Sequence, residues 1–88
     1  MAVNKSKING AASSVDAELM EWVKERQSKM LEILTPSQEK LMRIRYGLDD
    51  GIPRTYAELG DVFKMSVERV RQTEALCLRR LRHPKNRI

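Results

Sequence analysis

Apolar side chains recur in the first half of this sequence at steps of three and four residues, the spacing of an amphipathic helix. The stripe begins after Asp16 and is formed by Leu19, Trp22, Val23, Met30, Ile33 and Leu34. Residues 1–14 are small and polar and show no such period. The pattern therefore predicts a helix from Asp16 to about Ile33, with Trp22 as its aromatic core anchor, after a flexible arm.

A second helix is indicated by the signals at both of its ends. Thr35 followed by Pro36 combines an N-cap with proline at the first helical position, and Gln38 completes a capping box. The apolar pattern continues to Tyr46, and Gly47 suits a left-handed C-terminal cap. The following residues, LDDGIPR, contain several turn formers, so the chain is expected to change direction before residue 55.

Two further helices follow at close spacing. Thr55 and Glu58 form a second capping box, and Ser66 caps another helix after the turn at Lys64-Met65. The expected inward positions are Tyr56, Leu59, Val62 and Phe63 in the first helix, and Val70, Thr73 or Glu74, Cys77, Leu78 and Leu81 in the second. Pro84 ends the pattern. Two helices joined by so short a turn, the second one basic, predict a helix-turn-helix.

These elements together predict an all-α fold. We expect a small four-helix domain with a C-terminal helix-turn-helix, in the winged-helix-like class of DNA-binding domains. Its expected organisation is a flexible N-terminal arm over residues 1–15, the domain over residues 16–84 and a basic tail over residues 85–88.

Composition excludes several functional classes. With 88 residues, the chain has room for one compact domain. Cys77 is the only cysteine and His83 the only histidine, so neither a disulfide nor a zinc site is predicted, and no cofactor is expected. No apolar run approaches the roughly 20 residues of a membrane span, and no signal peptide is recognised. We expect a cytoplasmic protein that is not an enzyme.

The charge is distributed unevenly along the chain. Acidic and basic side chains cancel over residues 1–34, so residues 35–88 carry the whole formal net charge of +5. No acidic residue follows Glu74, and the basic cluster beyond it consists of Arg79, Arg80, Arg82, Lys85 and Arg87. A polyanion is the natural partner of such a cluster, although a solvated surface would have the same composition.

The start of the last helix carries side chains suited to reading bases. Helical spacing places Val67, Glu68, Arg71 and Gln72 on one outward face. Arginine can bind guanine, glutamine adenine and glutamate cytosine in the major groove, and valine can pack against a thymine methyl group. Arg69 lies to the side of this face, where a phosphate contact is expected. An exposed helix without any DNA partner can show the same residue types.

Residues 34–84 resemble region 4 of the primary sigma factors, the sigma-70 family of bacterial RNA polymerase subunits. The resemblance rests on LTPSQEKLMRIRYGLDDG and on TYAELGDVFKMSVERVRQTEALCLRRLRHP, whose motifs follow one another in the family's order without gaps. It implies that the last two helices read the minus-35 promoter element, and that an apolar surface binds the flap of the polymerase beta subunit. No counterpart of region 2, which melts promoter DNA, is recognised, so we expect a fragment or a small relative.

The resemblance also implies roles for individual residues. Glu68, Arg71 and Gln72 match positions that read bases; Arg45, Thr55 and Arg69 match positions near the DNA backbone; Arg79, Arg80 and Arg82 match the face that activators bind. Leu41, Ile44, Tyr46 and Leu48 are candidates for the flap-facing surface, or alternatively for the domain core. Activators and anti-sigma factors are further implied partners.

Four positions depart from the family pattern. Val67 stands where a basic residue is usual, Ser37 replaces a frequent Arg, Leu76 replaces a frequent Lys, and Thr73 replaces a core Ile. Loss of a phosphate contact or of a bidentate guanine contact weakens DNA binding by about 1–3 kcal/mol each. The minus-35 specificity of the family is therefore not carried over unchanged.

Two other functions remain open from the sequence. One is an autonomous helix-turn-helix regulator, in which Trp22 and the first helix would form a dimer interface. The other is a phage- or plasmid-type sigma mimic that acts mainly by binding polymerase. Val67 and Leu76, which depart from the family pattern, favour this function.

Overall fold

The computed structural model describes residues 15–83, and these residues form five α-helices and no strand. The helices are α1 (Ala17–Glu25), α2 (Gln27–Ile33), α3 (Pro36–Arg45), α4 (Tyr56–Phe63) and α5 (Val67–Arg82). The all-α fold with a C-terminal helix-turn-helix is confirmed. Most of the expected arm and the whole basic tail lie outside the described residues. None of the described helices is long and apolar enough to cross a membrane.

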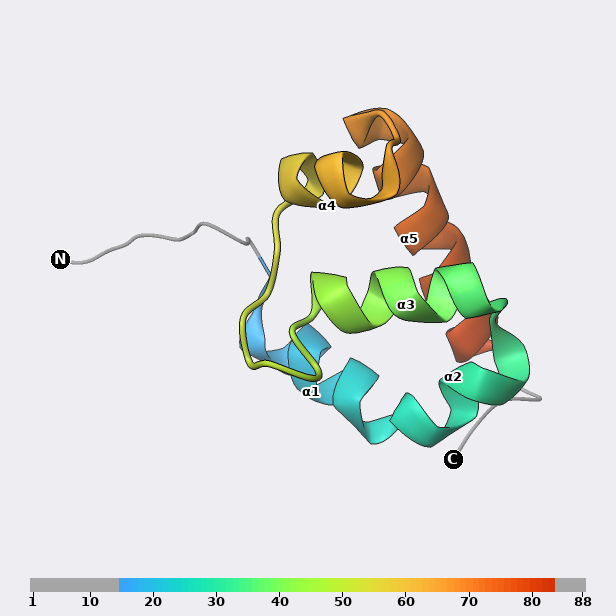
Figure 1. Ribbon diagram of the computed structural model, residues 1–88. Coiled ribbons are helices and arrows are strands. Elements are labelled where there is room, and N and C mark those ends of the chain that lie inside the picture. The colour runs from blue at the N-terminus through green and yellow to red at the C-terminus, as the bar shows by residue number, and fades with distance from the viewer. Residues whose placement is uncertain (1–14, 84–88) are drawn as a thin grey trace, which may run out of the picture.

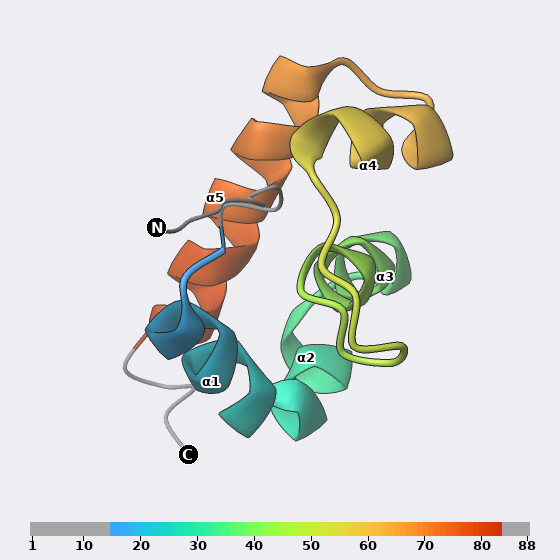
Figure 2. The same ribbon diagram turned by 90° about the vertical axis from the view of Figure 1, so that its left-hand side faces the viewer.

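Helix α5 is the element on which the others pack. Figures 1 and 2 show α4 against its N-terminal part, α3 crossing beside its middle, and α1 and α2 near its C-terminal end. One core cluster joins α1, α2 and α3 to the second half of α5 and consists of Val23, Met30, Leu34, Met42, Tyr46, Cys77 and Leu81. A second joins α3 and α4 to the first half of α5 and consists of Leu41, Leu59 and Val70. The position of the helix-turn-helix is therefore set by its contacts with α3.

The expected helix from Asp16 to Ile33 is interrupted, which corrects the prediction of four helices. The break lies at Arg26, whose backbone N–H bonds to the carbonyl of Val23 at 3.0 Å. The carbonyl of Trp22, its usual partner in a continuous helix, instead accepts a bond from the Arg26 guanidinium at 2.9 Å. The same guanidinium lies 4.0 Å from the centre of the Trp22 ring. At Arg26 the side chain thus takes the place of the backbone N–H as the donor to the Trp22 carbonyl.

The helix starts agree with the sequence signals. Both capping boxes are present: Thr35 with Gln38 at the start of α3, and Thr55 with Glu58 at the start of α4. The Ser66 hydroxyl accepts from the N–H of Arg69 at 3.1 Å and caps α5. These bonds satisfy donors that would otherwise lack partners, so the boundaries could be predicted locally.

The turn of the helix-turn-helix is tight because two backbone positions allow it. Lys64 has φ 58° and ψ 46°, which is the left-handed conformation. A Cβ atom at Gly60 would lie 2.7 Å from the carbonyl oxygen of Met65, so only glycine permits this approach. Val62, expected to face inward, is 55% exposed. The buried face of α4 is formed by Leu59, with Tyr56 and Phe63 packed beside it.

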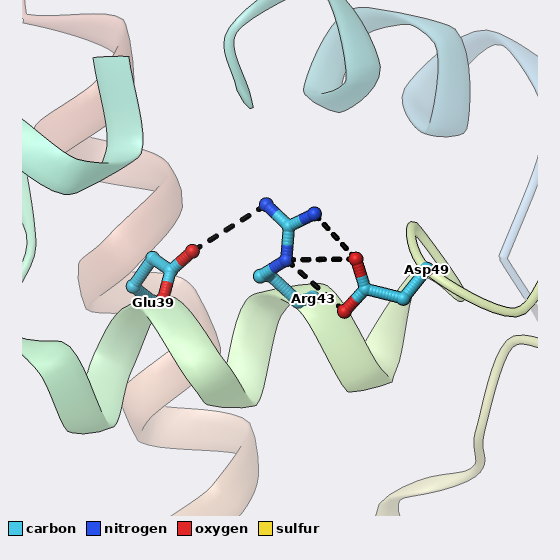
Figure 3. A network of polar contacts seen from close by, with 3 residues as sticks. All are labelled: Glu39, Arg43 and Asp49. Carbon is cyan, nitrogen blue, oxygen red and sulfur yellow. Dashed lines mark hydrogen bonds and ion pairs between the residues drawn. The ribbon is translucent and has the colours of Figure 1, made fainter. Parts of the chain in front are cut away.

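The loop after α3 is held by an arginine of that helix. Gly47 has φ 61°, which confirms the left-handed cap. Figure 3 shows Arg43 between Glu39 and Asp49: its Nε lies 3.1 Å from both oxygens of Asp49, and its Nη1 lies 3.4 Å from Oε2 of Glu39. The Arg43 guanidinium holds the pKa of the Asp49 carboxyl below its ordinary value. The ion pair thus fixes the start of the loop that leads to α4.

A buried carboxylate connects three helices. Glu74 of α5 is 5% exposed, and its Oε2 accepts from Arg45 Nε at 3.2 Å and from the Tyr46 hydroxyl at 2.5 Å. Its Oε1 accepts from the Tyr56 hydroxyl of α4 at 2.5 Å. Arg45, 3% exposed, also donates to the carbonyl of Arg54 at 2.6 Å. We call Glu74, Arg45, Tyr46 and Tyr56 the Glu74 network.

The network resolves a point that the sequence left open. Glu74 rather than Thr73 is the fully inward residue of α5, while the Thr73 hydroxyl donates to the carbonyl of Arg69 at 2.8 Å. Burial, and then the hydrogen bond to Glu74, raise the pKa of Tyr46 and that of Tyr56. Both tyrosines therefore remain neutral donors to the carboxylate at neutral pH.

We expect Glu74→Gln to lower the free energy of unfolding by about 3 kcal/mol, because it leaves the buried Arg45 without its opposite charge. Urea unfolding followed by circular dichroism measures this loss. Glu32→Gln, the same change at an exposed position of α2, is the matched control and should have little effect. Equal, small effects of the two substitutions would contradict the importance of the ion pair.

We expect Lys64→Gly to raise the free energy of unfolding by roughly 0.5–1 kcal/mol, because glycine adopts positive φ without steric cost, offset in part by its greater unfolded-state entropy. Thermal or urea unfolding gives the difference. Lys64→Ala keeps the strain while it removes the charged side chain, and should not stabilise. A similar gain from alanine would mean that charge, and not backbone conformation, is responsible.

Candidate nucleic-acid interface

The first two turns of α5 present the expected polar face to solvent. Val67, Glu68, Arg71 and Gln72 are all exposed. Glu68 Oε1 accepts from Arg71 Nε at 3.1 Å, and Oε2 accepts from Arg71 Nη2 and, at 3.3 Å, from Gln72 Nε2. Glu68 therefore joins the three polar side chains that the sequence grouped, since it contacts both Arg71 and Gln72.

The electrostatics of this face follow from the same contacts. The hydrogen bond from Arg71 lowers the pKa of Glu68, and the bond to Glu68 raises the pKa of Arg71. Both groups stay ionised over the whole physiological range. The pair is more than half exposed, so water screens it and a nucleic-acid base can compete for its donors and acceptors.

A groove of about 290 Å³ lies between α3 and α5, next to this face. We call it the α3–α5 groove; its lining is Thr35, Ser37, Gln38, Leu41, Met65, Arg69, Gln72, Thr73 and Leu76. Arg69 brings a positive charge to the groove, and the capped start of α3 brings hydroxyl and amide groups. Ser37 and Leu76, two of the positions that depart from the family pattern, both line it. No local sequence pattern predicted that these segments would meet.

The expected backbone contacts are placed differently from one another. Arg69 is exposed near the start of α5. Thr55 is half-buried and caps α4. Arg45 is buried in the Glu74 network, which corrects its expected place at the DNA backbone. The positive charge of Arg45 is paired with Glu74 inside the fold. The sequence signal for this pairing was the place of Glu74 on the inward stripe of α5.

The basic end of α5 divides into different environments. Arg79 is exposed. Arg80 reaches the carbonyl of Ile33 at 3.5 Å and Gln38 Oε1 at 3.4 Å, so it ties α5 to the junction of α2 and α3. The Arg82 guanidinium lies 5.4 Å from the centre of the Trp22 ring. Lys85 and Arg87 lie outside the described residues.

The candidates for the flap-facing surface separate by burial. Leu41 is 1% exposed and Tyr46 is fully buried, so both belong to the domain core, the alternative that the sequence had left open, and not to a flap-facing surface. Ile44 and Leu48 are half-buried at the edges of the core clusters. Trp22, expected in the core, packs partly buried against the first cluster and contacts Arg26 and Arg82.

Cys77 and His83 differ in their surroundings. Cys77 is fully buried, and burial raises the pKa of its thiol to about 11, so it is a small core residue. His83 is exposed at the end of α5. Within residues 15–83, no three acidic, histidine or cysteine side chains gather closely enough to hold a metal ion.

Helices α4 and α5, joined by the three-residue turn over residues 64–66, form a helix-turn-helix within an all-helical domain, the arrangement of a large class of DNA-binding domains. Residues 30–83 match the family model of sigma-70 region 4, and the match covers more than half of the chain. The chain belongs to the sigma-70 region 4 family. This is a family of non-enzymatic DNA-binding domains, so the expectations of family and of a non-enzymatic protein are confirmed.

Curated relatives support this membership. The chain is 49% identical over 74 residues to the RNA polymerase sigma factor SigA of Clostridium acetobutylicum, and 47% identical over 74 residues to SigA of a Bacillus species and of Listeria monocytogenes. Each alignment covers 84% of this chain and 20% of the relative. The chain thus spans about a fifth of the length of these sigma factors.

Proposed function

We propose that the chain is a transcription-initiation module that binds promoter DNA at the minus-35 element and the RNA polymerase core. The observation that carries the proposal is the exposed face of Glu68, Arg71 and Gln72 on the first two turns of α5. A recognition helix meets base edges with these turns when it enters the major groove.

Contacts to the DNA backbone surround this face in the proposed complex. Arg69 at the α3–α5 groove is placed to meet a phosphate, and the start of α4 at Thr55 offers a second approach to the backbone. Arg79 and Arg82 are candidates for phosphate or for the acidic surface of an activator. These contacts orient the domain, while base specificity comes from the face of α5.

Polymerase binding is proposed through the beta-subunit flap. Two observations support it: the relatives are named as RNA polymerase sigma factors, and Ile44 and Leu48 leave apolar surface at the edge of the core. Attachment to polymerase raises the effective concentration of the domain at a promoter. A weaker DNA face is then sufficient.

A second candidate function is a sigma-like protein that acts mainly by binding polymerase. It is favoured by Val67, Ser37 and Leu76, which are uncharged and lie on the base-reading face or in the α3–α5 groove. Both functions predict polymerase binding, and they differ in whether duplex DNA is read by sequence.

We expect Arg71→Ala to weaken binding to a minus-35 duplex by about 1–3 kcal/mol and to relax preference at one base pair. Fluorescence anisotropy with matched and scrambled duplexes at low salt measures both effects. Arg79→Ala, on the same helix but away from its first turns, is the control and should weaken both duplexes alike. An equal loss on the two duplexes for Arg71→Ala would make it a phosphate contact and contradict the base-reading role.

We expect the chain to co-elute with core RNA polymerase and to lose this association when the flap is deleted from the polymerase. Leu48→Asp should weaken the association because it places a charge in an apolar contact, whereas Val62→Asp, on exposed α4, should not. Circular dichroism of both variants checks that they are folded. Undiminished association with flap-deleted polymerase would remove the flap as the docking site.

A further inference from the structure

An apolar side chain stands at the start of the recognition helix. Val67 is the first residue of α5 and is 48% exposed. The other large, exposed hydrophobic residues in the described part of the chain are Leu31, Ile52 and Val62, and none belongs to α5. Val67 is therefore the one large, exposed hydrophobic residue of α5, on a helix face that is otherwise polar.

The position of Val67 is well defined relative to the polar residues of this face. Glu68 follows it directly, and Arg71 lies one helical turn further on, which makes Val67 and Arg71 neighbours on the surface. Because Glu68 contacts both Arg71 and Gln72, the polar side chains group around Glu68 and leave the valine methyl groups accessible. A β-branched side chain is stiff in a helix, so little conformational freedom is lost when it makes a contact.

The major groove offers a specific apolar partner for such a side chain. Thymine carries a C5-methyl group there, whereas unmodified cytosine presents only hydrogen at the same carbon. A valine cannot exchange hydrogen bonds with a base edge, so it distinguishes bases by contact with this methyl group.

We propose that Val67 is a specificity-determining residue that contacts a thymine methyl group at the base pair facing the first turn of α5. This inference rests on the proposed function, since it requires α5 to enter the major groove. The DNA element that the chain prefers then contains an obligatory thymine, adjacent to the base pairs read by Arg71 and Gln72. The preference arises from an apolar contact, so it depends little on salt.

Uracil substitution tests this contact directly. In the minus-35 duplex each thymine is replaced in turn by uracil, which removes one methyl group and keeps the base pair. The affinity of the chain for each duplex is measured by fluorescence anisotropy at low salt. We expect one position at which uracil weakens binding by roughly fourfold, the effect of one buried methyl group. Val67→Ala should bind the thymine and uracil duplexes equally well at that position.

Val62→Ala is the matched control, because it is the same change at a similarly exposed residue of α4. It should retain the difference between thymine and uracil. If the chain prefers the matched duplex but no uracil weakens binding, or if Val67→Ala keeps the difference, the valine contact is excluded while the proposed function stands. If the chain shows no preference for the matched duplex, both proposals fail.

Discussion

The carboxylate of Glu74 is the group on which the arrangement of this domain depends. Glu74 stands in the middle of α5. Its carboxylate accepts hydrogen bonds from Arg45 and Tyr46 at the end of α3 and from Tyr56 at the start of α4. Burying an ion pair costs several kcal/mol in desolvation, and partners on both oxygens are what make this burial tolerable. Since each partner must be in place at once, the network favours one relative position of the three helices.

The same network links the two core clusters. Tyr46 belongs to the first core cluster and Tyr56 packs against the second, so the Glu74 network connects the part of α5 that faces α1 and α2 with the part that carries the exposed polar side chains. Glu68, Arg71 and Gln72 are exposed on the same helix whose Val70 and Glu74 are buried. Helix α5 thus joins a buried side, held by the Glu74 network, to an exposed side whose ion pair is open to water.

The family match and the residues that depart from the family pattern concern different parts of the domain. The match over residues 30–83 accounts for the helix-turn-helix. The uncharged residues Val67, Ser37 and Leu76 lie on the exposed face of α5 or in the α3–α5 groove, outside the buried core clusters. The fold of the family is therefore kept while the surface of α5 and of the groove differs in chemistry.

The sequence by itself determined the features that depend on neighbouring residues. Capping boxes at Thr35 and Thr55, the left-handed Gly47, and the polar face of α5 all follow from contacts within a few residues along the chain. The tertiary structure decided the rest, because long-range partners are not encoded by local spacing. It turned Arg45 from an expected DNA contact into a core ion pair with Glu74, 29 residues away, and formed the α3–α5 groove from two separate helices.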